Sequence, residues 1–291
     1  MAVAEPVVVA PVRRWRRAPV LPAAMRRISR LDRIAIYLLI GLTVVVIVAP
    51  LFAPYPGTEP AGDSFVKPFR DGFLLGTDDI GRDIFSRVLL GMRETWLGAI
   101  AVILSGVLIG GAIGLVAGSV GGWVDNALMR FTDLFLALPG PILAIAVVAA
   151  LGPSLQHLLI AVAIVWWPFY ARIVRGEVKA LASRPHLEAA RLAGAGPFRR
   201  MFRHLLPGAL PAVLVTASLD VSALVLTLAA LSFLGLGAPA PQPELGAMSY
   251  RGLNYLQEYW WVPVMPALAV MFLCVIANLA GDGVRDMFGD R

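Results

Sequence analysis

The chain has 291 residues, of which 58% are hydrophobic and 15% charged, with a formal net charge of +6. Soluble domains average about 25% charged and about 45–50% apolar residues, so this composition excludes an ordinary water-soluble protein. The single cysteine excludes an intrachain disulfide, and the three histidines show no metal-binding spacing. Several uncharged runs exceed the roughly 20 residues that a membrane-spanning helix needs, which indicates an integral membrane protein. These runs are 34–58, 95–124, 134–171 and 259–281.

The first 30 residues form a basic, arginine-rich segment. Prolines at positions 6, 11, 19 and 22 prevent a continuous helix there. We therefore predict a largely disordered tail over 1–30 and one membrane domain over 31–291. A cleaved signal peptide is not expected, because the charged segment is too long and the apolar run that follows is long enough to span a membrane.

The apolar runs are predicted to form six spanning helices. The run 134–171 is too long for one helix and is divided at "LGPSLQ" (151–156). With six spans both termini lie on one side, and 19 of the 25 lysines and arginines then share that side. The positive-inside rule places this side in the cytoplasm, together with the basic loop 172–207. The predicted spans are 34–53, 97–118, 131–150, 155–171, 211–235 and 260–280.

Two predicted spans contain packing features that leave alternatives open. The second span has four glycines spaced by four residues, which places small residues along one helix face. That face packs either inside one bundle or against a partner subunit. In the third span, "LPGPI" (138–142) interrupts the helix, and the resulting kink either borders a cavity or accommodates packing. The four glycines are Gly106, Gly110, Gly114 and Gly118.

The fifth predicted span carries Asp220 near its middle. A carboxylate at this depth is costly unless it faces water or a polar partner. Asp220 is therefore a candidate for a substrate pathway, with a hydrogen-bonded acid inside the bundle as the alternative. One such group disfavours a proton-coupled transporter, which usually needs more than one. It also disfavours a membrane-embedded enzyme, which would bring several polar groups together.

The loop 172–207 holds eight lysines and arginines, and two short helices fit it. Ser183 is predicted to cap the first helix, with Pro185 in its first turn and Gly194 at its end. The second helix is predicted to start at Pro197 and to lie along the membrane surface on an apolar face. A slim helix held out into the cytoplasm has the shape to enter a groove on another protein. The apolar face comprises Phe198, Met201, Phe202 and Leu205.

The same loop resembles a motif of the permease subunits of ATP-binding-cassette (ABC) importers. The motif is Glu-Ala-Ala, three residues, Gly, nine residues, an aliphatic residue, one residue and Leu-Pro. Here it reads "EAA" at 188–190, Gly194 and "LP" at 206–207, with His204 in the aliphatic position. Further stretches resemble the C-type permease of the dipeptide/oligopeptide/nickel branch, and the resemblance runs from about residue 30 to the end. These stretches are "LGTDDIGRDIFSRVLLGMR" (75–93), "GGWVDNALMRFTDLFLALP" (121–139), "LSFLGLG" (231–237) and "NLAGDGVRD" (278–286).

The resemblance implies an all-α type I ABC importer permease fold, with six transmembrane helices and a cytoplasmic coupling helix, in the bacterial inner membrane. That helix would dock into a cytoplasmic ATPase subunit. The branch often has a glutamate where this chain has Leu228, so only Asp220 is assigned to the substrate pathway. The implied coupling residues are Glu188, Ala189, Ala190, Arg191, Gly194, Leu206 and Pro207.

The implied partners are a homologous second permease, one or two ATPase subunits, an extracytoplasmic solute-binding protein and membrane lipid, without nucleic acid. The outer loops 54–95 and 236–259 would dock the binding protein, and Trp260 and Trp261 would belong to an interfacial belt. The chain has no GxxxxGK[ST] phosphate loop, since neither Lys67 nor Lys179 follows a glycine.

We therefore expect no catalytic residue, cofactor or metal on this chain, and ATP and magnesium to be used by the partner ATPase. The expected cargo is a dipeptide or short oligopeptide. A nickel or metal chelate or haem is the alternative, and a non-transporting membrane scaffold is the remote one.

Overall fold

The computed structural model describes residues 30–288, and the regular elements within that range are helices. The predicted basic tail lies outside the described residues, except for Arg30. The α-helices are α2 (Arg30–Phe52), α3 (Ile84–Val120), α4 (Gly122–Leu136), α5 (Gly140–Leu151), α6 (Leu155–Ala182), α7 (Pro185–Leu192), α8 (Pro197–Arg200), α9 (Leu206–Phe233), α10 (Leu245–Gly252) and α11 (Trp261–Phe288). A π-helical turn (Met201–Leu205) joins α8 to α9, and a 3-10 turn (Leu253–Tyr255) follows α10.

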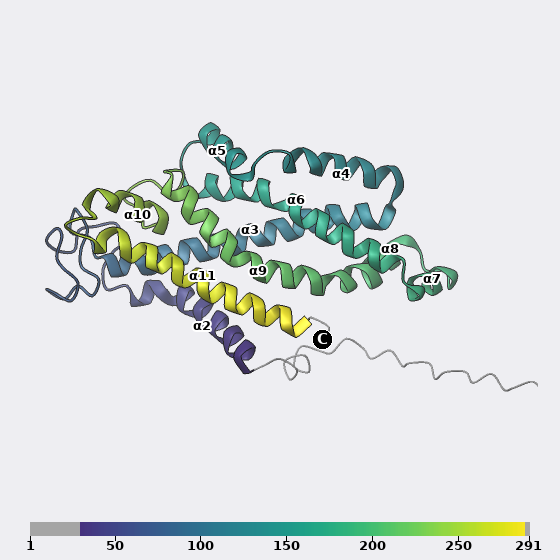
Figure 1. Cartoon of the computed structure of the whole chain (residues 1–291), viewed down its shortest axis with the longest axis horizontal. Coiled ribbons are helices and arrows are strands. Elements are labelled where there is room, and N and C mark those ends of the chain that lie inside the picture. The colour runs from purple at the N-terminus through teal and green to yellow at the C-terminus, as the bar shows by residue number, and fades with distance from the viewer. Residues whose placement is uncertain (1–29, 289–291) are drawn as a thin grey trace, which may run out of the picture.

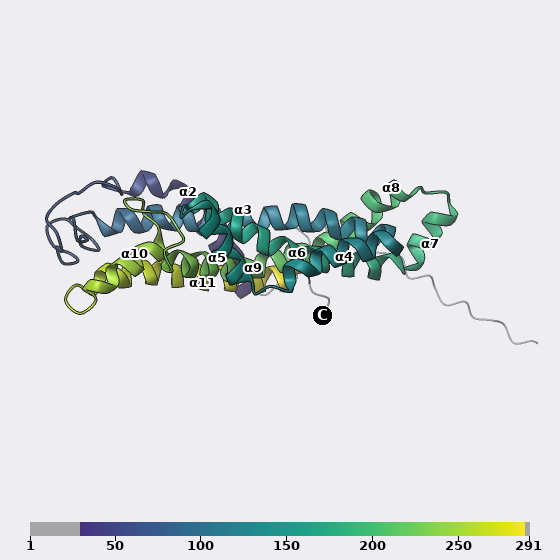
Figure 2. The ribbon, with the colours of Figure 1, turned by 90° about the horizontal axis from the view of Figure 1, so that it is seen from above.

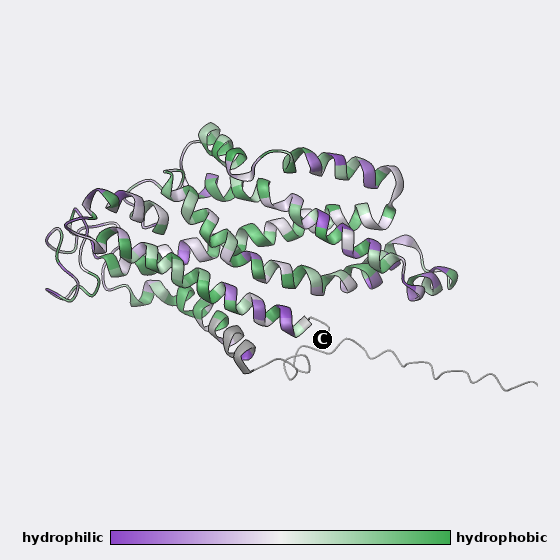
Figure 3. Cartoon of the chain, viewed as in Figure 1, coloured by the Kyte–Doolittle hydropathy of each residue, from purple (hydrophilic) through white to green (hydrophobic). Residues whose placement is uncertain are grey.

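The long helices α3, α6, α9 and α11 run along the long axis of an elongated molecule (Figure 1). The loop between α2 and α3 and the short helix α10 lie at one end, whereas α7 and α8 lie at the other (Figures 1 and 2). Hydrophobic residues dominate the middle of the bundle, and hydrophilic residues gather toward its two ends (Figure 3). This distribution is what a bilayer requires of a protein that crosses it.

Four helical segments of the described chain are long and apolar enough to cross a membrane, namely Ile84–Val120, Leu155–Ala182, Pro197–Phe233 and Trp261–Met287. The pair α4 and α5 would be a fifth crossing if the two form one broken span. Within α2, the apolar part Leu39–Phe52 is shorter than a crossing. The multi-pass membrane character is therefore confirmed, while the count of six spans stays a prediction.

The segment predicted as one span over 131–150 is two helices in the structure. The axes of α4 and α5 differ by 80°. Pro139 lies directly before α5, and Pro141 occupies its first turn, where a proline is tolerated because no helical N–H is needed there. A Cβ added at Gly140 would lie 2.8 Å from Cγ1 of Val165 on α6, so the break allows α5 to pack closely on α6.

The glycine face of the second predicted span packs inside the chain. A Cβ at Gly110 would overlap the carbonyl oxygen of Trp167, and one at Gly114 would overlap that of Ala171. At Gly118 it would lie 2.8 Å from the Cβ of Val178. All of these neighbours belong to α6, so α3 and α6 approach backbone to backbone. Of the two alternatives for this face, the structure shows packing within one bundle.

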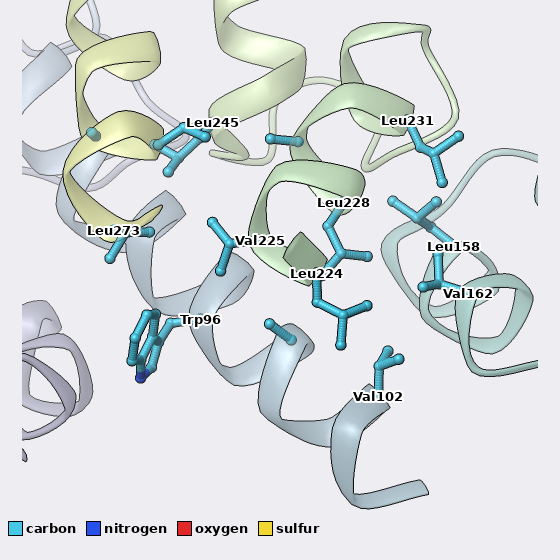
Figure 4. Close-up of a cluster of buried hydrophobic side chains, with 14 of the residues drawn as sticks. Trp96, Val102, Leu158, Val162, Leu224, Val225, Leu228, Leu231, Leu245 and Leu273 are labelled. Atoms are coloured by element: carbon cyan, nitrogen blue, oxygen red, sulfur yellow. The ribbon is translucent and has the colours of Figure 1, made fainter. Parts of the chain in front are cut away.

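The main hydrophobic core contains side chains of α2, α3, α5, α6, α9, α10 and α11. Figure 4 shows part of this core. Leu224 and Leu228 of α9 point toward α3 and α6 in this core, and Trp96 of α3 lies on its other side (Figure 4). Leu228 is only 2% exposed. Position 228, where the branch that the sequence resembles often has a glutamate, is therefore an apolar packing position in this chain.

The loop between α2 and α3 is tied firmly to the segment before α11. Thr77 donates to the carbonyl of Asp63 at 2.7 Å and accepts from Val66 N–H at 2.8 Å. Phe65 stacks on Tyr259 with ring centroids 4.0 Å apart. Trp261 donates its indole N–H to the carbonyl of Thr77 at 3.3 Å and is only 2% exposed.

Trp261 is thus a core residue rather than the interfacial residue we expected, because the folded loop covers it. Trp260 remains about half exposed. Nearby, Glu244 caps α10 by accepting from the N–H groups of Gly246 and Ala247 at 3.2 and 2.9 Å. Burial raises the pKa of this glutamate. The two predicted outer loops, 54–95 and 236–259, therefore form one joint structure at this end, which we call the loop cap.

Candidate functional site

The short helix α7 lies where the sequence predicts a helix, but it begins at Pro185, one residue later than a cap at Ser183 implies, and its cap differs from the prediction. The residue before it is Arg184, which makes no side-chain capping bond. Ser183, expected to cap α7, instead ends α6 and donates its hydroxyl to the carbonyl of Ala180 at 3.0 Å. The reason is that α6 continues through Arg172 to Ala182, so much of the predicted loop is helical.

The end of α7 depends on the backbone of Gly194. Its φ is +80°, in the left-handed region that favours glycine. The N–H of Ala195 donates to the carbonyl of Ala190 at 3.0 Å, and the N–H of Gly194 donates to that of Arg191 at 3.0 Å. This pattern satisfies the last carbonyls of the helix. A Cβ at Gly194 would meet no atom within 4 Å, so the conformation, and not the space, calls for glycine.

Most of α7 projects from the end of the molecule (Figure 1). Leu187 is buried and anchors the helix. Glu188, Ala189 and Arg191 are exposed, and Leu192 is 84% exposed. A short helix with one buried anchor and an exposed apolar and charged surface is suited to bind another protein.

The predicted support helix from Pro197 is not a separate helix on the membrane surface. It runs through the π-helical turn into α9, so that Pro197–Phe233 is one continuous segment. The N–H of Leu206 donates to the carbonyl of Met201, which widens the helix by one residue just before Pro207. Pro207 has no N–H to donate, so one backbone hydrogen bond of an α-helix is missing at this position. The π-helical turn lies just before it.

The predicted apolar face of that helix is divided. Leu205 is buried and belongs to a second group of buried side chains, here called the inner hydrophobic cluster, and the partly buried Met201 packs against this cluster. The inner hydrophobic cluster consists of Leu115, Val174, Val178, Leu181, Leu187, Leu205, Ala209 and Val213. Phe198 and Phe202 are exposed. His204, which stands in the motif's aliphatic position, lies half-buried within the π-helical turn.

The two halves of the motif meet at the inner hydrophobic cluster. Leu187 precedes the Glu-Ala-Ala part, and Leu206 belongs to the Leu-Pro part, and both pack in this cluster with side chains of α3, α6 and α9. A cavity of about 780 Å³ beside it is lined by Glu188 and Arg191 from α7, by Ser119 from α3, and by neighbouring residues. The structure therefore places Glu188, Arg191 and Leu206 of the motif around one junction between α7 and the long helices.

Two acidic residues of α4 hold α6 at this end, and sequence reasoning did not single them out. Arg175 donates in a bidentate manner to the buried Asp125, and Lys179 donates to Asp125 at 2.5 Å. Arg172 pairs with Asp133 at 2.7 Å on the surface. The spacing of these charges about two turns apart on α4 is the signal that could have indicated an ion-paired helix face.

Asp220 lies half-buried on α9 and accepts hydrogen bonds from two aromatic residues of α6. The hydroxyl of Tyr170 donates to it at 2.9 Å, and the indole N–H of Trp166 donates at 3.4 Å. Tyr170 itself is fully buried. The carboxyl group thus has polar partners at this depth, as its cost in the membrane requires.

These features define a polytopic helical membrane protein that presents a short helix at one end and a folded loop cap at the other. The chain belongs to the family of binding-protein-dependent transport system inner membrane components, whose model matches residues 110–291. The resemblance inferred from the Glu-Ala-Ala motif is therefore confirmed.

Relatives are similar over most of their length. The chain is 36% identical to the probable D,D-dipeptide transport system permease protein DdpC of Escherichia coli (strain K12), over 86% of this chain and 85% of the relative. It is 40% identical to the di/tripeptide transport system permease protein DppC of Pseudomonas aeruginosa (strain UCBPP-PA14), over 82% and 80%. It is 42% identical to the glutathione transport system permease protein GsiD of Pectobacterium atrosepticum, over 73% and 70%.

The fold is similar to that of a solved transporter. A chain of the inward-facing MetNI methionine ABC transporter matches with a TM-score of 0.55 and 25% identity, covering 69% of this chain and 95% of that chain. The match confirms the predicted type I ABC importer permease fold. Several relatives are peptide transport permeases, which does not favour the nickel alternative.

Proposed function

We propose that this chain is a transmembrane permease subunit of an ATP-driven importer that moves dipeptides or short oligopeptides across the bacterial inner membrane. The observation that carries the proposal is identity of 36% to 40% to dipeptide and di/tripeptide permeases over more than four fifths of the chain. A complete importer would also contain a homologous second permease, one or two cytoplasmic ATPase subunits and an extracytoplasmic binding protein. Membrane lipid surrounds the assembly.

In this proposal α7 is the coupling helix. Glu188, Ala189, Ala190, Arg191 and Gly194 form or end the helix that enters a cleft of the ATPase. Support comes from the exposure of α7 and from Leu192, an apolar side chain left open to solvent at its tip. The ATPase subunits bind and hydrolyse ATP with magnesium, and this chain supplies no catalytic residue or cofactor.

Movement of α7 would reach the spanning helices through the inner hydrophobic cluster. Leu187 connects α7 to this cluster, and Leu206 with Pro207 begins α9 beside it. Because α8, the π-helical turn and α9 are continuous, a pull on the loop acts on the helix that carries Asp220. ATP-driven closure of the ATPases would thereby switch the spans from inward-open to outward-open.

We propose that Asp220 borders the substrate pathway between the two permeases. Support comes from its half-buried position and its polar pairing with Tyr170 and Trp166. The end with α7 would face the cytoplasm together with both termini, in accordance with the excess of basic residues on that side. The loop cap formed by the outer loops would then receive the binding protein.

Reconstitution of the full complex in proteoliposomes tests the proposed function. With its binding protein and ATP, the complex should take up a radiolabelled dipeptide, and a nickel chelate or haem should not compete. Saturable uptake of the nickel chelate or of haem, without peptide uptake, would contradict the proposed cargo. ATP hydrolysis that no solute and no binding protein stimulates would instead favour the scaffold alternative.

A further inference from the structure

A small cavity with an excess of arginine lies within the loop cap, at the opposite end from α7. Its volume is about 240 Å³, and it lies between the segment that enters α3 and the α10 region. Three arginines and two aspartates contribute to its lining, which gives the charged groups a net charge of +1. They are Arg82, Arg87, Arg251, Asp78 and Asp79.

The acidic groups of the cavity are already engaged within the loop. Asp78 is buried, and its Oδ1 accepts from the N–H groups of Ile80 and Arg82 at 3.1 and 2.9 Å. Its Oδ2 accepts from Nε of Arg82 at 2.6 Å. Asp79, at the more exposed edge, lies 3.6 Å from the same arginine. Arg82 and the two aspartates therefore form a closed ionic group.

The other two arginines are bound mainly by neutral groups. Arg87 is buried and donates to the carbonyls of Gly57 and Pro241, and its contact with Asp78 is long, at 3.7 Å. Arg251 donates from Nη2 to the carbonyl of Ala238 at 3.1 Å. Its Nη1 is buried and has no hydrogen-bond partner among the described residues.

A buried guanidinium nitrogen without an acceptor is costly, and a carboxylate is the group that matches its geometry. Glu244 is the nearby acid that could have filled this role, but its two oxygens cap α10. The charge of Glu244 still acts on Arg251, but among the described residues no carboxylate forms an ion pair or hydrogen bond with the guanidinium of Arg251.

We propose that this cavity receives a single carboxylate side chain, an aspartate or glutamate of the extracytoplasmic binding protein, which pairs with Arg251 beside Arg87. This inference rests on the proposed function, because it needs the loop cap to be the face where the binding protein docks. Pairing of this partly buried arginine across the interface would fix the register of docking and slow dissociation.

The size of the cavity favours a side chain over a whole substrate. Sites for small molecules usually have about 300–1,000 Å³, so a cavity of about 240 Å³ is small for a peptide. A single carboxylate group fits it readily. Ile80, about half exposed, and Tyr255 also line it and would contact the residues flanking that group.

The experiment measures ATP hydrolysis by the full complex in lipid nanodiscs as the purified binding protein of the same importer is titrated. Arg251→Gln should raise the half-stimulating concentration of binding protein by roughly tenfold or more, since a charge-assisted hydrogen bond is lost. Arg251→Lys should raise it less. The matched control is Arg70→Gln, an exposed arginine of the same loop outside the cavity, which should change it less than about twofold.

A second measurement keeps every arginine in place. A photo-crosslinking amino acid at Ile80 should attach to the binding protein within a few residues of an acidic side chain. The same crosslinker at Phe69, exposed on the loop but outside the cavity lining, should give a different attachment point or none. Attachment of the Ile80 probe to the second permease would overturn the assignment. This result does not depend on the Arg251→Gln variant, so it holds even if that variant folds poorly.

The carboxylate could be supplied by the binding protein or by the transported peptide, and the two sources give different results. If the binding protein supplies it, the loss in Arg251→Gln should be equal for peptide-free and peptide-loaded binding protein. A change only in the peptide concentration for half-maximal uptake would assign the carboxylate to the peptide and overturn the proposal. A wild-type complex that does not respond to binding protein contradicts the proposed function itself, whereas equal responses of wild type and Arg251→Gln contradict only this inference.

Discussion

Gly194 shows how one residue sets the geometry of the predicted coupling helix. Gly194 has a φ of +80° and follows the end of α7, and the chain then continues to α8. Because an added Cβ would meet no neighbour, the requirement lies in the backbone alone. In this left-handed region the backbone conformation costs non-glycine residues about 1–2 kcal/mol, and it costs asparagine less than most.

We therefore expect Gly194→Val to lower peptide uptake strongly and Gly194→Asn to retain most of it, with the complex assembled in both cases. Uptake by proteoliposomes and ATP hydrolysis stimulated by binding protein measure the coupling. Gly196→Ala is the control, because Gly196 has a φ of −63° and open space around its Cβ position. Wild-type coupling in Gly194→Val would contradict the role assigned to α7.

Asp220 calls for a variant pair, because it has both a structural and a transport interpretation. Asp220→Leu leaves the buried hydroxyl of Tyr170 without its acceptor, which should cost about 1–3 kcal/mol of stability. The double variant with Tyr170→Phe removes both partners and should recover part of this loss. Thermal unfolding of the purified complex measures both effects.

If Asp220 borders the pathway, uptake should stay low in the double variant although stability recovers. Uptake that recovers together with stability would make Asp220 a packing residue. At this scale the sequence singled out candidate residues, but not their partners. Ser183 was wrongly assigned as the cap of α7, because a local capping pattern does not reveal that α6 extends to Ala182.

At the scale of the elements, α3 and α6 make a very close backbone contact. Gly110 and Gly114 face backbone carbonyls of α6, so the two helices have no room for a methyl group between them. Such close approach stabilises helix pairs in membranes through van der Waals contact. Asp125 adds ion pairs from α4 to Arg175 and Lys179 at the same end of α6.

Gly110→Leu should therefore abolish accumulation of folded protein, because the added side chain must displace the backbone of α6. Gly111→Leu is a matched control, since a Cβ at Gly111 would lie 4.0 Å from its nearest neighbour, Cγ2 of Val174. Fluorescence-detected size-exclusion chromatography of both variants measures the folded fraction. Equal folded fractions would show that the α3–α6 contact can relax.

The four-residue glycine spacing predicted a close-packed face but not its partner, because sequence spacing defines a face and not what covers it. In a similar way, the prolines at 139 and 141 predicted a kink, whereas the 80° bend depends on how α5 packs against α6. The apolar face from Phe198 to Leu205 predicted a helix, and only the packed structure shows that this helix continues into α9.

At the scale of the whole molecule, the two ends have different structures and different proposed partners. One end presents α7, and the other presents the folded loop cap (Figure 1). One cavity lies beside α7, and the cavity lined by Arg251 lies within the loop cap. A membrane must separate these ends, because the middle of the bundle is apolar (Figure 3). The orientation is a prediction from the basic residues.

Thiol labelling tests this orientation. In a Cys274→Ser background, Asp71→Cys in the loop cap should react with a membrane-impermeant maleimide in intact spheroplasts. Leu192→Cys on α7 should react only after permeabilisation, since α7 would face the cytoplasm. Both positions are exposed, so protein packing does not protect either one. The reverse pattern would contradict the placement of both termini in the cytoplasm.

The sequence by itself determined the membrane class, the approximate places of four long apolar helices and the family. These depend on composition, apolar run length and local motifs, which are properties of contiguous residues. Only the tertiary structure decided that the glycine face meets α6, that Asp220 is bound by Tyr170 and Trp166, and that Arg251 has an unpaired buried nitrogen. Each of these depends on which distant segments pack together, since burial and hydrogen-bond partners are set by neighbours in space.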